Sequence, residues 1–127
     1  NKLQSLLENF MLKSISTMDG ASEAFYHGMM LGLCAVLGSQ YQVRSNRESG
    51  LGRFDIELLP MVKNMPGFIF ELKHTKDMNI DLDSLADSAL RQIDNMKYDA
   101  ELKAFGVDDI VKIGIAFRQK SAVVKRG

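Results

Sequence analysis

The sequence has few features that would cross-link a small protein or anchor it in a membrane. It contains one cysteine in 127 residues, which excludes an internal disulfide and a cysteine-based zinc site. No apolar run approaches the roughly 20 residues that a membrane helix needs, and no signal-peptide pattern precedes the first helical residues. These absences favour a reduced, cytoplasmic setting without membrane contact.

An excess of charge of one sign is also missing. Sixteen basic and sixteen acidic residues cancel, so net charge does not indicate a nucleic-acid-binding protein. No G-x-x-x-x-G-K-[ST] motif occurs, which excludes ATP binding through a P-loop. The charges are nevertheless unevenly distributed, because residues 110–127 hold five basic side chains and no acid, whereas acids dominate residues 71–87. This polarity predicts that the C-terminal end faces an anion.

What is present is the composition of an ordinary globular domain, with 46% apolar and 25% charged residues. The length corresponds to one domain. Because apolar residues at helical spacing begin with the first residues of the chain, we assign residues 1–18 to a helix that ends a preceding region. We assign residues 19–127 to the domain itself.

The hydrophobic periodicity predicts an α/β fold. Apolar spacing of three and four residues predicts helices over residues 3–17, 21–37 and 79–104, the last starting at residue 79 or a few residues later. Alternation predicts four strands and a short fifth, over residues 41–46, 53–59, 67–73, 110–117 and 121–124. The order ααβββαβ, with a helical crossover before the last long strand, indicates a mixed four- to five-stranded sheet flanked by helices.

Several single residues mark the ends and surfaces of the helices. Asp19 and Gly38 are the expected ends of the second helix, and Gly106 is the expected end of the third. Two glycines, at 28 and 32, predict a thin side of the second helix against which another element packs closely. Cys34 lies among apolar neighbours on that helix and is expected to be an inert core residue.

The hairpin of the second and third strands predicts an acidic pair. If its loop is symmetric about Lys63, Ile56 faces Phe70 on one side of the sheet. The same register sets Asp55 directly opposite Glu71 on the other side, with Cβ atoms ~4.5–5.5 Å apart. Like charges in this position destabilise a sheet, so we expect a compensating hard cation such as Mg²⁺.

Lys73 lies two residues beyond Glu71 and therefore on the same side of the strand. Two acids and a lysine around a metal are typical of phosphoryl-transfer sites. The alternative is a surface cluster in which Lys73 neutralises the two carboxylates. Spacing alone leaves both interpretations open.

Two segments, GRFDI at 52–56 and IFELK at 69–73, resemble the D…ExK signature of the PD-(D/E)XK nuclease superfamily. Further matching segments are EAFYHG at 23–28, SNRESGLGRFD at 45–55, ALRQI at 89–93 with KY at 97–98, and KIGIAF at 112–117. Together they resemble the bacterial members found behind an AAA-ATPase-like domain, over about residues 21–120. The one departure is Phe54, which stands where the superfamily name has proline.

The resemblance implies a restriction-endonuclease-like core and a Mg²⁺- or Mn²⁺-dependent phosphodiesterase that acts on DNA. The implied metal ligands are Asp55, Glu71, the backbone carbonyl of Leu72 and an additional acid, Glu23; the implied catalytic residues are Asp55, Glu71, Lys73 and Gln92. Two of these roles have alternatives. Glu23 would also suit the positive end of its helix, and Gln92 would also suit a solvated helix surface. For His27, one turn after Glu23, we favour packing against the sheet.

The basic residues around the glycine-rich turn have two interpretations. Arg44, Arg47 and Arg53, together with Lys120, are candidate contacts for a phosphate backbone. Alternatively, the glycines only form a hairpin turn and the arginines pair with Glu48. The whole chain likewise has two readings, an active nuclease module linked to an AAA-ATPase-like domain or a catalytically silent nucleic-acid- or partner-binding domain with a nuclease fold. The oligomeric state stays open, and a dimer is compatible with the sequence.

Overall fold

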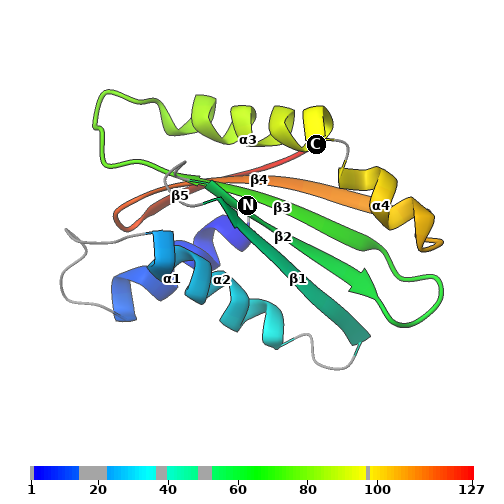
Figure 1. Cartoon of the computed structure of the whole chain (residues 1–127). Coiled ribbons are helices and arrows are strands. Elements are labelled where there is room, and N and C mark those ends of the chain that lie inside the picture. The colour runs from blue at the N-terminus through cyan, green and yellow to red at the C-terminus, as the bar shows by residue number, and fades with distance from the viewer. Residues whose placement is uncertain (1, 15–22, 37–39, 49–52, 97) are drawn as a thin grey trace.

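Five strands form one sheet that carries helices on both faces (Figure 1). The computed structural model describes residues 2–14, 23–36, 40–48, 53–96 and 98–127. The helices are α1 (Lys2–Ser14), α2 (Glu23–Ala35), α3 (Leu82–Met96) and α4 (Tyr98–Ala104). The strands are β1 (Tyr41–Glu48), β2 (Arg53–Pro60), β3 (Gly67–His74), β4 (Ile110–Arg118) and β5 (Ser121–Arg126).

The strands lie in sequence order, β1-β2-β3-β4-β5. The first three form an antiparallel meander, β4 is parallel to β3, and β5 returns antiparallel to β4. A parallel pair requires a crossover, which α3 and α4 supply. The predicted α/β class, mixed sheet and element order are therefore confirmed, with five strands.

Alternation along the strands creates two different faces. Ile56, Leu72 and Ile115 are fully buried on the face that packs against α1 and α2. On the other face, Ile69 is buried with Ile93 and Leu102 under α3 and α4. Each such side chain stabilises the fold by roughly 1.5–3 kcal/mol relative to an exposed one. The sheet is thus the middle layer between two hydrophobic cores.

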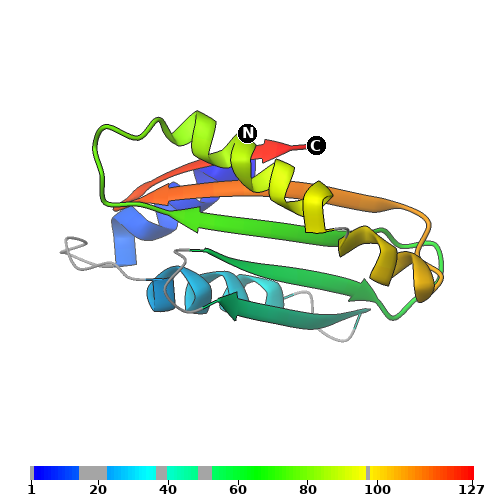
Figure 2. The same cartoon turned by 45° about the horizontal axis from the view of Figure 1, so that its top comes forward.

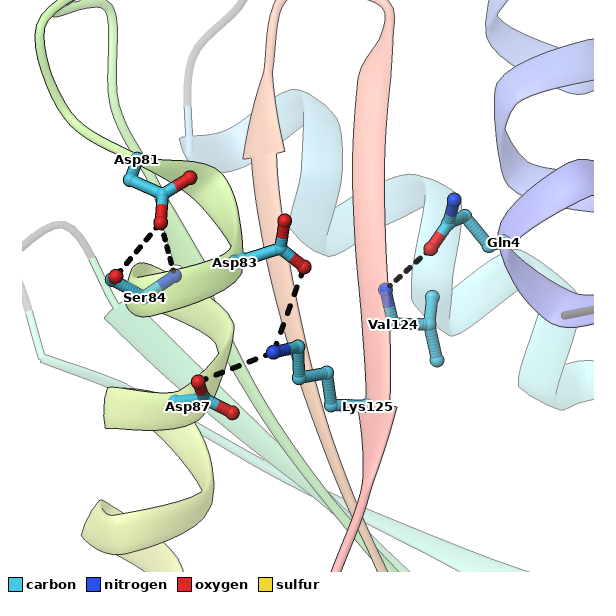
Figure 3. A network of polar contacts seen from close by, with 7 residues as sticks. All are labelled: Gln4, Asp81, Asp83, Ser84, Asp87, Val124 and Lys125. Atoms are coloured by element: carbon cyan, nitrogen blue, oxygen red, sulfur yellow. Dashed lines mark hydrogen bonds and ion pairs between the residues drawn. The ribbon is translucent and has the colours of Figure 1, made fainter.

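The first helix belongs to this core and also covers one edge of the sheet. Leu7 and Met11 of α1 are fully buried against the strands. The Oε1 atom of Gln4 accepts a hydrogen bond from the Val124 N–H at 3.0 Å (Figure 3). Oε2 of Glu8, one turn later, accepts one from the Ala122 N–H at 3.4 Å. The first helix therefore packs against the sheet that follows it, and the assignment of residues 1–18 to a preceding region stays a prediction.

The long helix predicted over residues 79–104 is instead two helices, α3 and α4. The first begins at Leu82 because the carboxylate of Asp81 accepts hydrogen bonds from the Ser84 N–H (3.3 Å) and Oγ–H (2.8 Å) (Figure 3). The same contacts hold the pKa of Asp81 below its usual range. Gly106 ends α4 as predicted, with φ of +84°, since the N–H of Val107 reaches the Leu102 carbonyl at 3.2 Å.

The prediction that Gly28 and Gly32 mark a close approach is wrong. A Cβ atom at either position would meet no described atom within 4 Å. The close approach occurs instead at Gly114 on β4, where a Cβ atom would lie 2.6 Å from the carbonyl oxygen of Ala86 on α3. The expected helix ends at 15–17, Asp19 and Gly38 lie outside the described residues. Among the described helices, none combines the length and apolar character of a membrane span.

Candidate active site

One row of residues crosses the whole sheet beside α3. Asn46, Asp55, Glu71, Gly114 and Lys125 are successive register partners from β1 to β5. Side chains of register partners project from the same face of a sheet. Contacts of Lys125 with Asp87 and the crowding of Gly114 by Ala86 identify this face as the one under α3.

The predicted acidic pair lies at the centre of this row. The register sets Asp55 opposite Glu71 and Ile56 opposite Phe70, as the symmetric hairpin required. Asp55 is 6% exposed and Glu71 is 1% exposed. Carboxylates are seldom this deeply buried unless they are paired with a cation or coordinate a metal. Two apposed oxygen ligands suit Mg²⁺, which uses one or two carboxylates and completes its shell with water and substrate phosphate oxygens.

The remaining residues of the ExK segment flank this pair. Lys73 is half-buried and projects from the same face as Glu71, two residues along β3. Leu72 lies between them with its side chain fully buried in the opposite core. Its backbone belongs to a strand with neighbours on both sides, Phe54 and Ile115. Glu71, the Leu72 carbonyl and Lys73 are thus held by one paired strand, and Asp55 by the strand next to it.

Gln92 is half-buried on α3, which packs on β3, β4 and β5. Asp87 and Asp94 of this helix contact Lys125 and Lys112, on the side of β4 and β5. At 100° per residue, Gln92 lies about 200° from Asp94 and about 140° from Asp87 around the helix. Gln92 therefore occupies the flank of α3 on the side of the acidic pair.

Glu23 is not brought to the acidic pair. It begins α2, in the helical layer on the other face of the sheet. Its charge acts on His74, three residues beyond Glu71 and therefore on the opposite face. Burial lowers the pKa of His74, while Glu23 opposes this shift. Within the described ranges, no three His, Cys, Asp or Glu side chains converge to hold a metal ion.

Two of the predicted phosphate contacts, Arg44 and Lys120, lie next to side chains of the protein itself. The guanidinium of Arg44 lies 4.9 Å from the ring centroid of Phe105, and its register partner on β2 is Glu57. Lys120 borders a cavity of about 430 Å³ that is also lined by Glu8 of α1. The side chains of Arg47 and Arg53 lie outside the described residues.

Three of the five basic side chains of the C-terminal segment have partners within the chain. They contact the acidic segment and α3, because the crossover folds residues 77–94 back over β4 and β5. Figure 3 shows the contacts of Lys125. The contacts are Lys112–Asp94 (2.9 Å), Lys125–Asp87 (3.1 Å), Lys125–Asp83 (3.5 Å), and Arg118 Nη1 to the carbonyl oxygens of Asp77 (3.1 Å) and Ile80 (2.6 Å). The two charged segments largely satisfy each other.

Two polar residues of this face were not predicted as part of the site from the sequence. Glu57 is 2% exposed and lies two residues from Asp55 on β2. Asn46 donates a hydrogen bond from Nδ2 to Oδ1 of Asp55 at 3.2 Å. Glu57 could have been found from its position two residues after Asp55, which places both on the same face of the strand. A β1–β2 hairpin symmetric about the bond between residues 50 and 51 would have indicated Asn46.

The other ionisable groups of interest lie elsewhere. Burial raises the pKa of the Cys34 thiol to about 11, as expected of an inert core cysteine. His27 contacts the Ser45 hydroxyl and packs its ring 4.9 Å from that of Phe54, on the α2 side of the sheet. A cavity of about 570 Å³ lies at the opposite end of β2 and β3, between their loop and the residues that follow α4.

Comparison with known proteins agrees with this geometry. The family model of the PD-(D/E)XK nuclease superfamily matches residues 21–127. A search of curated proteins found no match to the chain. The matched segment contains all five strands, both buried carboxylates and the lysine beside them. The chain belongs to the PD-(D/E)XK nuclease superfamily.

Proposed function

We propose that this domain is a metal-dependent phosphodiesterase that cleaves DNA, as a module linked to an AAA-ATPase-like domain. The observation that carries the proposal is the burial of Asp55 and Glu71 directly opposite each other, with Lys73 on the same face. Family membership supplies the reaction class. The neutral charge of the chain and the engaged basic segment favour the alternative, a silent nucleic-acid- or partner-binding domain.

The position of each site residue suggests its role in catalysis. Asp55, Glu71 and the Leu72 carbonyl would hold Mg²⁺ or Mn²⁺, which when bound polarises the phosphate and lowers the pKa of a water molecule. The ammonium group of Lys73 would orient that water or offset negative charge that develops on the phosphate oxygens. Gln92, on the flank of α3 toward the pair, would hydrogen-bond the water or a phosphate oxygen. Glu23 stays a prediction as an additional ligand.

The open half of the α3 face is the proposed surface for the substrate. Figure 2 shows α3 lying across β3 and β4, whereas β1 and β2 extend beyond it. Positions 44 and 53 belong to this face by register, with Glu57 and Lys73 as partners, and we propose that Arg44 and Arg53 contact phosphates there. Position 47 pairs with Phe54 of the other face, and Lys120 lies beside α1, so we propose Arg47 and Lys120 as contacts outside this half of the α3 face. Positive charge beside an acidic metal site, rather than on it, suits a polyanion whose scissile phosphate must reach the metal.

Cleavage assays with plasmid, linear duplex and single-stranded substrates in Mg²⁺, Mn²⁺ or EDTA test the proposal. We expect Asp55→Asn, Glu71→Gln and Lys73→Ala to abolish cleavage. Glu57→Gln is the matched control, because Glu57 is an equally buried carboxylate on the same face but has Ile69 and Arg44 as register partners. Equal cleavage by the wild type and Asp55→Asn would contradict the proposal. Metal binding without cleavage of any substrate would favour the silent domain.

The contacts with phosphate are tested separately by salt dependence. Each lost phosphate contact should flatten the log–log salt slope of duplex binding by ~0.9. We therefore expect Arg47→Ala combined with Arg53→Ala to weaken binding of all duplex sequences alike and to flatten this slope. An unchanged slope would assign these arginines to the turn alone.

A further inference from the structure

The hydrogen bond between Asn46 and Asp55 links an edge strand to the acidic pair. Asp55 is 6% exposed, whereas Asn46 lies exposed on β1 and is its direct register partner. The Nδ2 atom of the amide donates to Oδ1 of Asp55 at 3.2 Å. Because an ionised carboxylate only accepts hydrogen bonds, the amide nitrogen must be the group that faces it. The contact therefore favours one rotation of the Asp55 carboxylate.

This rotation matters because of what lies on the other side of Asp55. Its second register partner is Glu71, so the carboxylate sits between an amide donor on β1 and a like charge on β3. Repulsion between the two carboxylates would favour rotation of Asp55 out of the orientation in which both bind one cation. A donor on the side away from Glu71 opposes that rotation. We propose that Asn46 is a positioning residue that holds the Asp55 carboxylate for metal binding, an inference that rests on the proposed function.

The surroundings of Asn46 distinguish this role from a structural one. On the same side of β1, Arg44 packs over Phe105, and Gln42 is an exposed residue whose register partner is the apolar Leu59. Asn46 itself is exposed, so its truncation removes little buried surface. Hydrogen bonds to metal-ligating side chains typically contribute 10–100-fold to metal affinity. Loss of Asn46 should therefore reduce metal binding without unfolding the protein.

The experiment is calorimetric titration of the full chain with Mn²⁺ in the absence of nucleic acid. We expect Asn46→Ala to bind Mn²⁺ about tenfold more weakly than the wild type. Gln42→Ala is the matched control, from the same strand and the same face, and should bind like the wild type. Asn46→Gln keeps the amide donor and should restore most of the affinity. Thermal unfolding in EDTA should give Asn46→Ala and Gln42→Ala the same midpoint.

The outcomes distinguish the positioning role of Asn46 from the proposed metal-dependent function. Wild-type affinity in Asn46→Ala, beside lost binding in Asp55→Asn, would overturn the positioning role and leave the metal site intact. A loss of affinity that Asn46→Gln does not restore would also overturn it. Absence of Mn²⁺ binding by the wild type would overturn the proposed function, and with it the inference.

Discussion

Gly114 on β4 lies so close to Ala86 on α3 that a Cβ atom there would stand 2.6 Å from the Ala86 carbonyl oxygen. Gly114 is also the register partner of Glu71. The helix therefore reaches the sheet backbone directly beside the acidic pair. This glycine sets the spacing between the layer that carries Gln92 and the strand that carries Glu71 and Lys73.

We expect Gly114→Ala to destabilise the fold, because the obstructing atom is backbone and α3 must move. Overpacking of this kind costs about 1–3 kcal/mol. Gly32→Ala is the matched control, since a Cβ at Gly32 meets no described atom within 4 Å. Replacing a helix-interior glycine by alanine in open space should stabilise the protein by about 0.5–1 kcal/mol. Urea unfolding midpoints of the two variants should shift in opposite directions.

Neutralising one member of the acidic pair should not unfold the protein in metal-free buffer. Directly opposite like charges destabilise a strand pair by about 0.2–1 kcal/mol, so Asp55→Asn and Glu71→Gln should unfold at or above the wild-type temperature in EDTA. Mg²⁺ at ten times its Kd should stabilise only the wild type, by about 1.4 kcal/mol. Equal destabilisation of both variants in EDTA would instead indicate a structural cluster with Lys73.

The first helix offers a sharp test of domain boundaries. Leu7 is fully buried in the core, whereas its neighbour Leu6 is 54% exposed. We expect Leu7→Ala to cost about 2–5 kcal/mol in the free energy of unfolding, and Leu6→Ala to change it by no more than about 0.5 kcal/mol. Chemical denaturation measures both. Equal, small effects would show that the domain is stable without its first helix.

His74 should make stability depend on pH. Burial lowers its pKa from the ordinary value of 6.5, Glu23 opposes this, and Lys76 lowers it further. The unfolded chain then binds this proton more readily than the folded one, so stability falls as the pH drops below about 6.5 toward the folded pKa. Urea midpoints at pH 7.5 and 5 should differ less in His74→Gln than in the wild type. An unchanged difference in His74→Gln would contradict this account.

The parts of the site that local pattern determines were predictable from the sequence. Alternation of apolar residues in β2 and β3, with a loop symmetric about Lys63, determined that Asp55 faces Glu71. Tertiary geometry decided the rest. The glycines at 28 and 32 look more like a close-packed surface than Gly114 does, because a sequence does not show which helix crosses which strand.

Charge and helix boundaries show the same limit. The acidic and basic segments look like opposite ends of a polarised chain, but the crossover sets Asp83 and Asp87 beside Lys125. The start of α3 depended on the Asp81–Ser84 contacts, which compete locally with continuation of the helix toward residue 79. Glu23 reaches the other face of the sheet through the position of α2, which sequence spacing does not reveal.

The hydrogen bonds from Gln4 and Glu8 of α1 also limit how copies of this domain can associate. They occupy outward N–H groups of β5, so a foreign strand can add there only by displacing α1. Continuous head-to-tail growth of a sheet needs two receptive edges on every copy. With Gln4 and Glu8 in place, the β5 edge lacks the free N–H groups that such growth would use at Ala122 and Val124. The first helix thus protects this edge of the sheet from edge-to-edge growth.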